Sequence, residues 1–185
     1  AMKTEGIELT IGWQHKGQVR YGVNAVFSDY SSVVTKYPNP NRLNTTWYKG
    51  QQIGEIWGYE THGLFQSESE IASAPVQNRL YSRWMPGDVR YVDLNGDNQI
   101  DWGNNTLDNP GDRKVIGNTT PRFSFGLNAN VQYRAFDLTL FFQGVGKREA
   151  APSPTSHVSN FFWGITGDLG QSSGFVQQHD RWTEA

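Results

Sequence analysis

The chain has 185 residues, a net charge of −2 and no cysteine, so we expect one domain or part of a larger protein, without disulfides or zinc–thiolate sites. No run of basic residues is present, which argues against nucleic acid or an anionic membrane surface as a partner. Aromatic residues make up 14% and charged residues 18%, a balance typical of β structure with polar loops.

The first predicted element is a β-hairpin within residues 1–28. From Ile7 to Gln14, and again from Tyr21 to Ser28, apolar and polar residues alternate. This period of two predicts two strands with one apolar face each. The short connection between them contains Gly17, as expected of a hairpin turn.

A long excursion, residues 29–122, follows the first hairpin. It is far longer than an ordinary loop, so we expect it to carry local structure. Ser67 opens a Ser-x-x-Glu capping box, which predicts a short helix from Glu68 to a point before Pro75. Weak alternation over residues 54–65 suggests a short strand.

A second hairpin is predicted within residues 123–146. Its strands alternate from Phe123 and from Phe136, with a tight turn at Arg134 and Ala135. The remaining tail, residues 147–185, is rich in Pro and Ser and is expected to be a loop. The predicted fold class is therefore mainly β: two antiparallel hairpins plus a long loop region with a short helix and a calcium-binding loop.

The connections are asymmetric, since those at one end of the strands are tight and those at the other end are long. Outer-membrane barrels have this layout, with aromatic girdles at both ends of the strands. The aromatic residues expected at the tight-turn end are Trp13, Tyr21, Tyr133 and Phe136, and those at the other end are Phe27, Tyr30, Phe123 and Phe142. Half of a soluble β-sandwich would alternate in the same way. Four strands cannot close a barrel, so the membrane interpretation requires a longer protein.

The clearest chemical pattern lies in the aspartate-rich residues 88–117. The segment from Asp93 to Asp101 has oxygen side chains at its positions 1, 3, 5 and 9, and position 7 offers a backbone carbonyl. Ca²⁺ takes about six to eight oxygen ligands in loops of this spacing. Mg²⁺ fits less well, because it requires a more rigid octahedral coordination geometry and tends to keep its bound water molecules. The pattern predicts a structural calcium site; the alternative is an Asp/Asn/Gly-rich turn that binds nothing.

The distal ligand of such a site is ambiguous from spacing. Position 12 falls on Asn104, which is neutral. Asp108 and Asp112 are charged alternatives, and either one requires the residues before it to loop out.

Eight short motifs occur in order along nearly the whole chain. They are residues 54–59 (GEIWGY), 61–66 (THGLFQ), 86–91 (PGDVRY), 93–97 (DLNGD), 112–118 (DRKVIGN), 121–123 (PRF), 141–146 (FFQGVG) and 180–183 (DRWT). In order and spacing they resemble the TonB-dependent outer-membrane receptors of the SusC/RagA type.

The resemblance implies a fragment from the C-terminal part of a large, plugged β-barrel. Such receptors import oligosaccharides or peptides through the outer membrane, take energy from the TonB system, and carry a SusD-like surface lipoprotein as a lid. The long loop region would then be extracellular. Without the plug and most of the barrel, the fragment would not transport anything alone.

The resemblance also bears on the distal ligand. In the family the Asp-Arg-x-x-Ile-Gly element closely follows the Asn-Gly-Asp loop, whereas here residues 102–111 intervene. This favours Asp112, with the inserted residues looped out. The expected calcium ligands are Asp93, Asn95, Asp97, the carbonyl of Gln99, Asp101 and Asp112.

No enzymatic activity is predicted, because the sequence shows no coherent set of nucleophile, acid and base. The histidines at positions 15, 62, 157 and 179 lack metal-like spacing. Trp47, Tyr48, Trp57 and Tyr59 are expected to pack rather than to stack on sugars. The alternative function is a free-standing calcium-dependent carbohydrate-binding β-domain. If the chain is a barrel fragment, its apolar faces should drive self-association or repacking against its own loops.

Overall fold

The computed structural model describes residues 1–150. The predicted motif at residues 180–183 and the tail from residue 151 onward lie outside the described residues. The chain divides into two compact units, one made of Ala1–Glu55 with Gly117–Glu149 and another that contains Ile56–Ile116.

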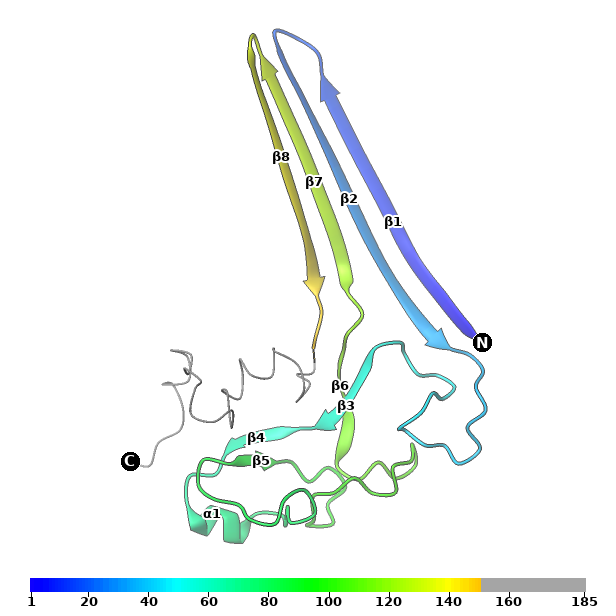
Figure 1. The fold of residues 1–185 in the computed structure, drawn as a ribbon, viewed down its shortest axis with the longest axis vertical. Coiled ribbons are helices and arrows are strands. Elements are labelled where there is room, and N and C mark those ends of the chain that lie inside the picture. Colours follow the sequence, from blue (N-terminus) through cyan, green and yellow to red (C-terminus); the bar gives the residue numbers. More distant parts are fainter. Residues whose placement is uncertain (151–185) are drawn as a thin grey trace, which may run out of the picture. The chain divides into compact units, whose positions relative to one another are not determined.

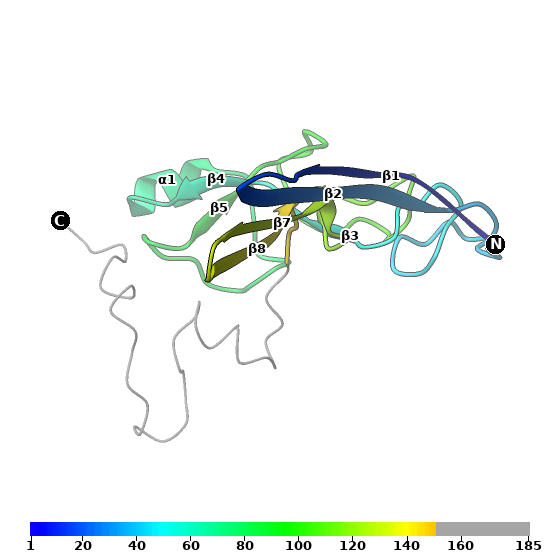
Figure 2. The ribbon, with the colours of Figure 1, turned by 90° about the horizontal axis from the view of Figure 1, so that it is seen from above.

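The first unit is built around a four-stranded antiparallel sheet in the order β1-β2-β7-β8 (Figure 1). Its strands are β1 (Met2–His15), β2 (Val19–Val34), β7 (Arg122–Tyr133) and β8 (Phe136–Lys147). The view from above shows the same strand order (Figure 2). Both predicted hairpins are confirmed, with turns at residues 16–18 and 134–135. In addition, β2 pairs with β7, which joins the two hairpins into one sheet.

The strands are longer than predicted at the end away from the tight turns. β2 continues past Ser28 to Val34, because residues 29–34 pair backbone to backbone with the first residues of β1. β8 likewise continues to Lys147. The expected aromatic girdle at this end is therefore wrong in part: Phe27 and Phe142 lie inside their strands rather than at the ends.

One face of the sheet is apolar across all four strands. Directly paired residues of antiparallel strands lie on the same face. One such row is Ile11–Ala25–Leu127–Phe142, and the next is Trp13–Val23–Ala129–Leu140. Ile11 and Phe142, on the outer strands, are 60% and 56% exposed. The described residues therefore leave the apolar face largely open.

The opposite face is polar. The row Gln14–Gly22–Asn130–Thr139 and the row Gly12–Asn24–Asn128–Phe141 carry small or amide side chains, apart from Phe141. Gly22 leaves room for a neighbour, because a Cβ there would lie 2.7 Å from the amide oxygen of Asn130. The sequence alternation thus corresponds to two chemically different faces.

The second unit contains short elements. β4 (Thr61–Leu64) pairs with β5 (Val89–Tyr91). β3 (Glu55–Tyr59) pairs with β6 (Arg113–Asn118), and most residues of these two strands belong to the second unit, while Glu55, Gly117 and Asn118 belong to the first. Helix α1 spans Glu68–Ser73, as predicted, and its N-cap Ser67 accepts a hydrogen bond from the amide of Glu70 (3.3 Å). Within residues 1–150, no helix is long and apolar enough to cross a membrane.

The most buried apolar side chains of the second unit are one that precedes α1 and one in the aspartate-rich stretch. Phe65 and Ile100 are 1% and 0% exposed. The amide of Ile100 donates to the carbonyl of Val76 (2.8 Å), and the amide of Val76 donates to the carbonyl of Asn98 (3.0 Å). These bonds attach the aspartate-rich stretch to the segment that follows α1.

Candidate metal centre

The Asp loop, residues 93–112, begins with a turn built by acidic and amide side chains. The Asp93 carboxylate accepts hydrogen bonds from the amides of Gly96 (2.6 Å) and Asn98 (2.8 Å). Asn95 accepts from the amide of Asp97, and Asp97 accepts from the amide of Gln99, both at 2.9 Å. Side chains of Asp and Asn commonly fold loops in this way. The turn therefore brings the first three expected ligands together.

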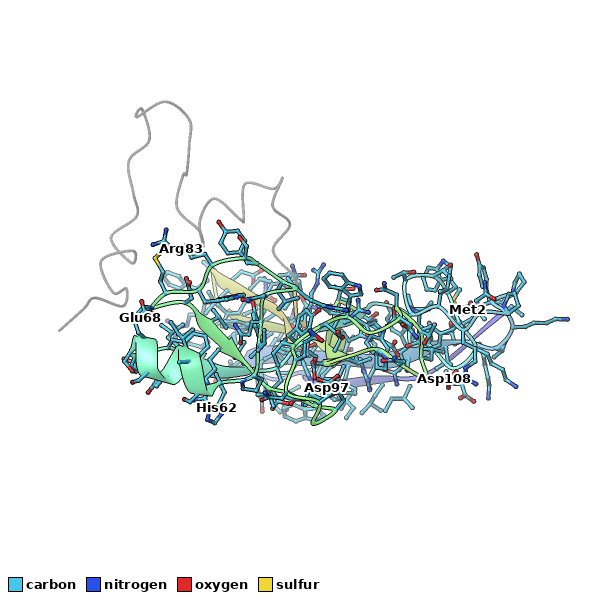
Figure 3. The ribbon with its side chains drawn as sticks, turned by 90° about the horizontal axis from the view of Figure 1, so that it is seen from below. Met2, His62, Glu68, Arg83, Asp97 and Asp108 are labelled. Atoms are coloured by element: carbon cyan, nitrogen blue, oxygen red, sulfur yellow. The ribbon has the colours of Figure 1, made fainter. Side chains whose placement is uncertain are left out.

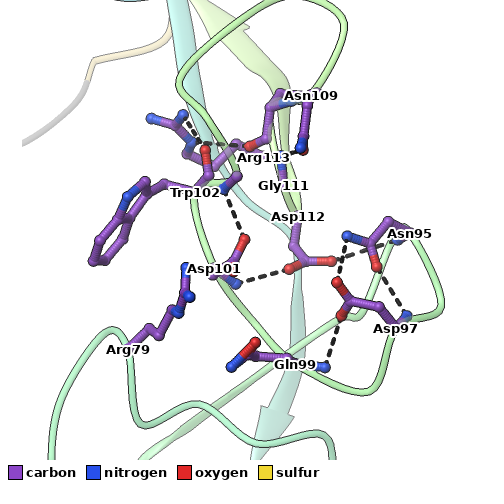
Figure 4. A network of polar contacts seen from close by, with 12 residues as sticks. Arg79, Asn95, Asp97, Gln99, Asp101, Trp102, Asn109, Gly111, Asp112 and Arg113 are labelled. Carbon is purple, nitrogen blue, oxygen red and sulfur yellow. Dashed lines mark hydrogen bonds and ion pairs between the residues drawn. The ribbon is translucent and has the colours of Figure 1, made fainter.

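Asp112 is the buried anchor of the loop. It is 0% exposed, and both of its carboxylate oxygens accept backbone amides (Figure 4). One oxygen accepts from Leu94 (2.8 Å) and Asn95 (3.4 Å), and the other accepts from Asp101 (2.8 Å). A buried carboxylate needs such donors to offset its lost hydration. Asp112 thus ties both ends of the predicted calcium segment to one point.

Asp101 lies on the other side of Asp112 from Asn95 and Asp97 (Figure 4). Its carboxylate is paired with the Arg79 guanidinium at 3.0 Å and also accepts from the amide of Gly103 at 2.7 Å. The spacing of the sequence predicts that Asp101 is the calcium ligand at position 9 of the loop. In the structure its carboxylate forms an ion pair with Arg79, a residue that the spacing of the aspartates does not identify.

Residues 102–111 form a closed side loop. Asp112 donates its amide to the carbonyl of Asp101 (3.0 Å), which brings the two ends of the insertion together. Gly111 has a φ of +64°, and a Cβ there would lie 2.3 Å from the Asp101 carbonyl oxygen. Arg113 closes the loop by donating to the carbonyl of Trp102 (3.0 Å) and to the side chain of Asn105 (2.9 Å). The insertion therefore loops out and leaves Asp112 against the turn.

The two other candidates for the distal ligand belong to this side loop. Asn104 donates its amide to the carbonyl of Asn109 (3.0 Å), and both Asn104 and Asp108 are exposed. Asp97 and Asp108 lie well apart (Figure 3). Asp112 contacts the turn directly, through the amides of Leu94 and Asn95.

The pKa of Asp93 is lowered overall. Partial burial raises it, but hydrogen bonds from the amides of Asn98, Gly96 and Asp97 outweigh that effect. Asp93 and Asp112 are thus neighbouring acidic groups held mainly by backbone N–H donors. A carboxylate such as that of Asp93, whose ionised form is favoured, suits the binding of a hard cation.

The donor chemistry of the loop fits Ca²⁺, since it consists of carboxylate, amide and carbonyl oxygens. Each oxygen of Asp93, Asn95 and Asp97 retains a lone pair beyond the N–H bonds described above. Within residues 1–150, however, no three or more His, Asp or Glu side chains form a group that could hold a metal ion. A cation would therefore depend on amide and backbone oxygens in addition to the carboxylates.

Two further residues shape the site without any signal in the ligand spacing. Gln77, 3% exposed, donates to the carbonyl of Val89 (3.2 Å) and accepts from the amide of Tyr91 (2.8 Å), and so holds β5 against the segment after α1. Arg79 follows two residues later and reaches Asp101. Both contacts are non-local, and the alternation of the sequence does not reveal them.

The aromatic residues of the excursion differ in exposure. Tyr48 is 9% exposed and hydrogen-bonds to Glu55, while Trp47 is 44% exposed. The ring of Tyr59 lies 5.4 Å from that of Tyr91. Tyr48 and Tyr59 therefore pack within the fold.

Comparison with known proteins places these features in context. Over 95 residues, or 51% of the chain, the sequence is 34% identical to TonB-dependent receptor P3 of Formosa agariphila. Over 140 residues, or 76% of the chain, it is 24% identical to TonB-dependent receptor P26 of the same organism. The chain spans 8% and 12% of the lengths of these relatives. No family model matches the sequence.

Proposed function

We propose that this chain is a piece of the barrel wall and an extracellular loop of a TonB-dependent outer-membrane receptor of the SusC/RagA type. The observation that carries the proposal is the four-stranded sheet with an open apolar face and a polar opposite face. Water disfavours an apolar face of this extent, whereas lipid covers it without cost. Similarity to two TonB-dependent receptors supports the same conclusion.

In this proposal the apolar face contacts lipid and the polar face lines the lumen. Amide and glycine residues such as Asn24, Asn128 and Gly22 suit a water-filled interior. The tight turns lie on the periplasmic side and residues 29–122 face the exterior. The complete receptor imports oligosaccharides or peptides, is energised by the TonB system, and pairs with a SusD-like lipoprotein. The piece itself has no enzymatic role.

The absence of cysteine from the sequence permits a direct test of the two faces. Leu140 and Thr139 are neighbours on β8 with side chains on opposite faces. In the chain dissolved in maltoside detergent, we expect Leu140→Cys to react slowly with a charged maleimide and Thr139→Cys to react rapidly. Ile11→Cys and Thr10→Cys on β1 form a second matched pair. Equal rates on both faces would contradict the lipid-facing assignment.

The behaviour of the chain in plain buffer provides an independent check. We expect self-association without detergent, because the apolar rows remain uncovered. Light scattering should show larger species that dissociate when maltoside is added. A compact monomer in buffer that binds a glycan in a calcium-dependent manner would instead support a free-standing carbohydrate-binding domain.

We also propose that the Asp loop binds Ca²⁺ and that the ion has a structural role. Asp93, Asn95, Asp97 and the carbonyl of Gln99 would hold it from one side, with Asp101 and Asp112 as the remaining ligands. Bound Ca²⁺ would neutralise neighbouring carboxylates and brace the loop against opening. The support is the turn that gathers Asp93, Asn95 and Asp97 beside Asp112.

Calorimetry on the whole chain tests the calcium proposal. Saturating Ca²⁺ at about 100 times its dissociation constant should add about 2.7 kcal/mol to the stability of the folded state. Asp97→Asn, which removes a charge and keeps the shape, should weaken binding, and Asp137→Asn on β8 is the matched control. No heat of binding, together with melting that is the same in calcium and in chelator, would contradict the proposal.

A further inference from the structure

A polar pocket lies between the two tight turns of the first unit. It is lined by Gly17, Gln18, Arg20, Gln132, Tyr133 and Arg134, and its volume is about 470 Å³. The turns are adjacent because β2 and β7 pair up to their ends, with Val19 opposite Tyr133 and Arg20 opposite Gln132 (Figure 1). The pocket is thus formed by the same pairing that joins the hairpins.

Two arginines contribute the charge of this pocket. Among the described residues, neither Arg20 nor Arg134 forms an ion pair, in contrast to Arg79 and Arg122. Arg134 has a φ of +53° at the turn, and its guanidinium lies 5.2 Å from the centre of the Tyr133 ring. The ring contact limits the directions that this guanidinium can take.

The neighbouring charges leave the pocket positive. Lys16 belongs to the first turn, next to Gly17. Asp137 is directly opposite Gln132 on β8 and is the nearby acidic residue of the second hairpin. The turn region therefore has three basic residues against one acidic residue, and amide side chains at Gln18 and Gln132 provide further hydrogen-bond donors.

We propose that this pocket binds an anionic phosphate group, with Arg20 and Arg134 as its principal ligands. Guanidinium groups match the geometry of phosphate oxygens and form paired, charge-assisted hydrogen bonds with them. The volume accommodates a phosphate together with the group that it esterifies. The source is either free phosphate in solution or the headgroup of an anionic phospholipid. This assignment does not depend on the Asp loop.

Titration with inorganic phosphate tests binding in solution. In NMR spectra of the chain in maltoside detergent, the side-chain N–H resonances of Arg20 and Arg134 should shift as phosphate is added, and the shift should saturate at about millimolar phosphate. A titration with chloride at equal ionic strength is the reference. Arg20→Gln and Arg134→Gln should each weaken the response about tenfold. Arg83→Gln removes one exposed positive charge elsewhere and should leave it unchanged. Melting curves establish that each variant remains folded.

Vesicle binding distinguishes the two sources. Vesicles of phosphatidylcholine with and without phosphatidylglycerol are compared. The apolar face should bind both kinds of vesicle equally, so the difference between them reports the effect of the anionic headgroup. A preference for phosphatidylglycerol that is lost in Arg20→Gln and Arg134→Gln identifies a lipid headgroup; a response to phosphate alone identifies the free anion. The proposal is overturned if the unmodified chain shows neither response, or if both variants behave like Arg83→Gln.

Discussion

Asp29 and Arg122 are 93 residues apart in sequence and form a two-pronged ion pair. The Arg122 Nε and Nη2 atoms lie 2.5 Å and 2.6 Å from the two carboxylate oxygens of Asp29. The amide of Phe123 also donates to Asp29, at 3.3 Å. Asp29 belongs to β2 and Arg122 begins β7, so the pair fixes the point at which the chain returns to the sheet after its long excursion.

Replacement of Arg122 by Lys should destabilise the first unit, because an ammonium group cannot form the two parallel bonds. A double-mutant cycle with Asp29→Asn should show that the two changes are not additive. The measurement is thermal unfolding, in maltoside, of the unmodified chain, the two single variants and the double variant. The exposed pair Lys3–Glu5, with side chains 63% and 72% accessible, is the control and should show little coupling. Additive effects of Arg122→Lys and Asp29→Asn would contradict the role of the pair.

Replacement of Asp112 by Ala should lower the free energy of unfolding by about 2–4 kcal/mol, since the buried amides of Leu94 and Asp101 lose their acceptor. Asp112→Asn should cost less, because one oxygen remains. Both losses should persist in chelator, since they arise from hydrogen bonds within the protein. Denaturant unfolding measures them, with Asp137→Ala as the surface control, expected within about 0.5 kcal/mol. A stability for Asp112→Ala equal to that of the control would rule out the anchoring role.

The sequence was sufficient for features that depend on neighbouring residues. Alternation identified the strands that contain Ile11, Ala25, Leu127 and Leu140, because period two reports directly which side chains share a face. The capping box at Ser67 located α1 within its first turn. These signals are local, and the structure confirms them.

Features that depend on distant partners were not accessible in the same way. β2 continues through Asp29 and the serines at positions 31 and 32 because β1 supplies backbone partners, although the apolar alternation has ended. β5 and β6 are short, and no periodicity marks them. The pair of Asp101 with Arg79 joins residues 22 apart, so spacing within the Asp loop could not reveal it.

Two glycines of the Asp loop provide a matched test of its geometry. Both Gly96 and Gly111 have positive φ, at +78° and +64°, so alanine strains the backbone at either position by about 1 kcal/mol. At Gly96 nothing lies within 4 Å of a new Cβ, whereas at Gly111 the Asp101 carbonyl oxygen lies at 2.3 Å. Gly111→Ala should therefore cost clearly more than Gly96→Ala in denaturant unfolding. Equal losses would show that the side loop does not close as described.

Asp93 should make the stability of the folded chain depend on pH. The amides of Asn98 and Gly96 stabilise its charged form, and the folded-state pKa lies below the ordinary value of 3.8. A group of this kind contributes stability that is complete above its unfolded pKa and is lost as the pH falls through its folded pKa. In metal-free buffer, Asp93→Asn should therefore be less stable than the unmodified chain at pH 6.

The difference between Asp93→Asn and the unmodified chain should shrink as the pH is lowered from about 5 to 2, because protonation removes the same charge that the substitution removes. Denaturant unfolding at a series of pH values measures it, and Asp137→Asn controls for the loss of one carboxylate elsewhere. A difference that stays constant over this range would mean that the amides hold the shape of the Asp93 side chain rather than its charge. The hydrogen bonds from Gly96 and Asn98 would then stabilise the turn without favouring the ionised form.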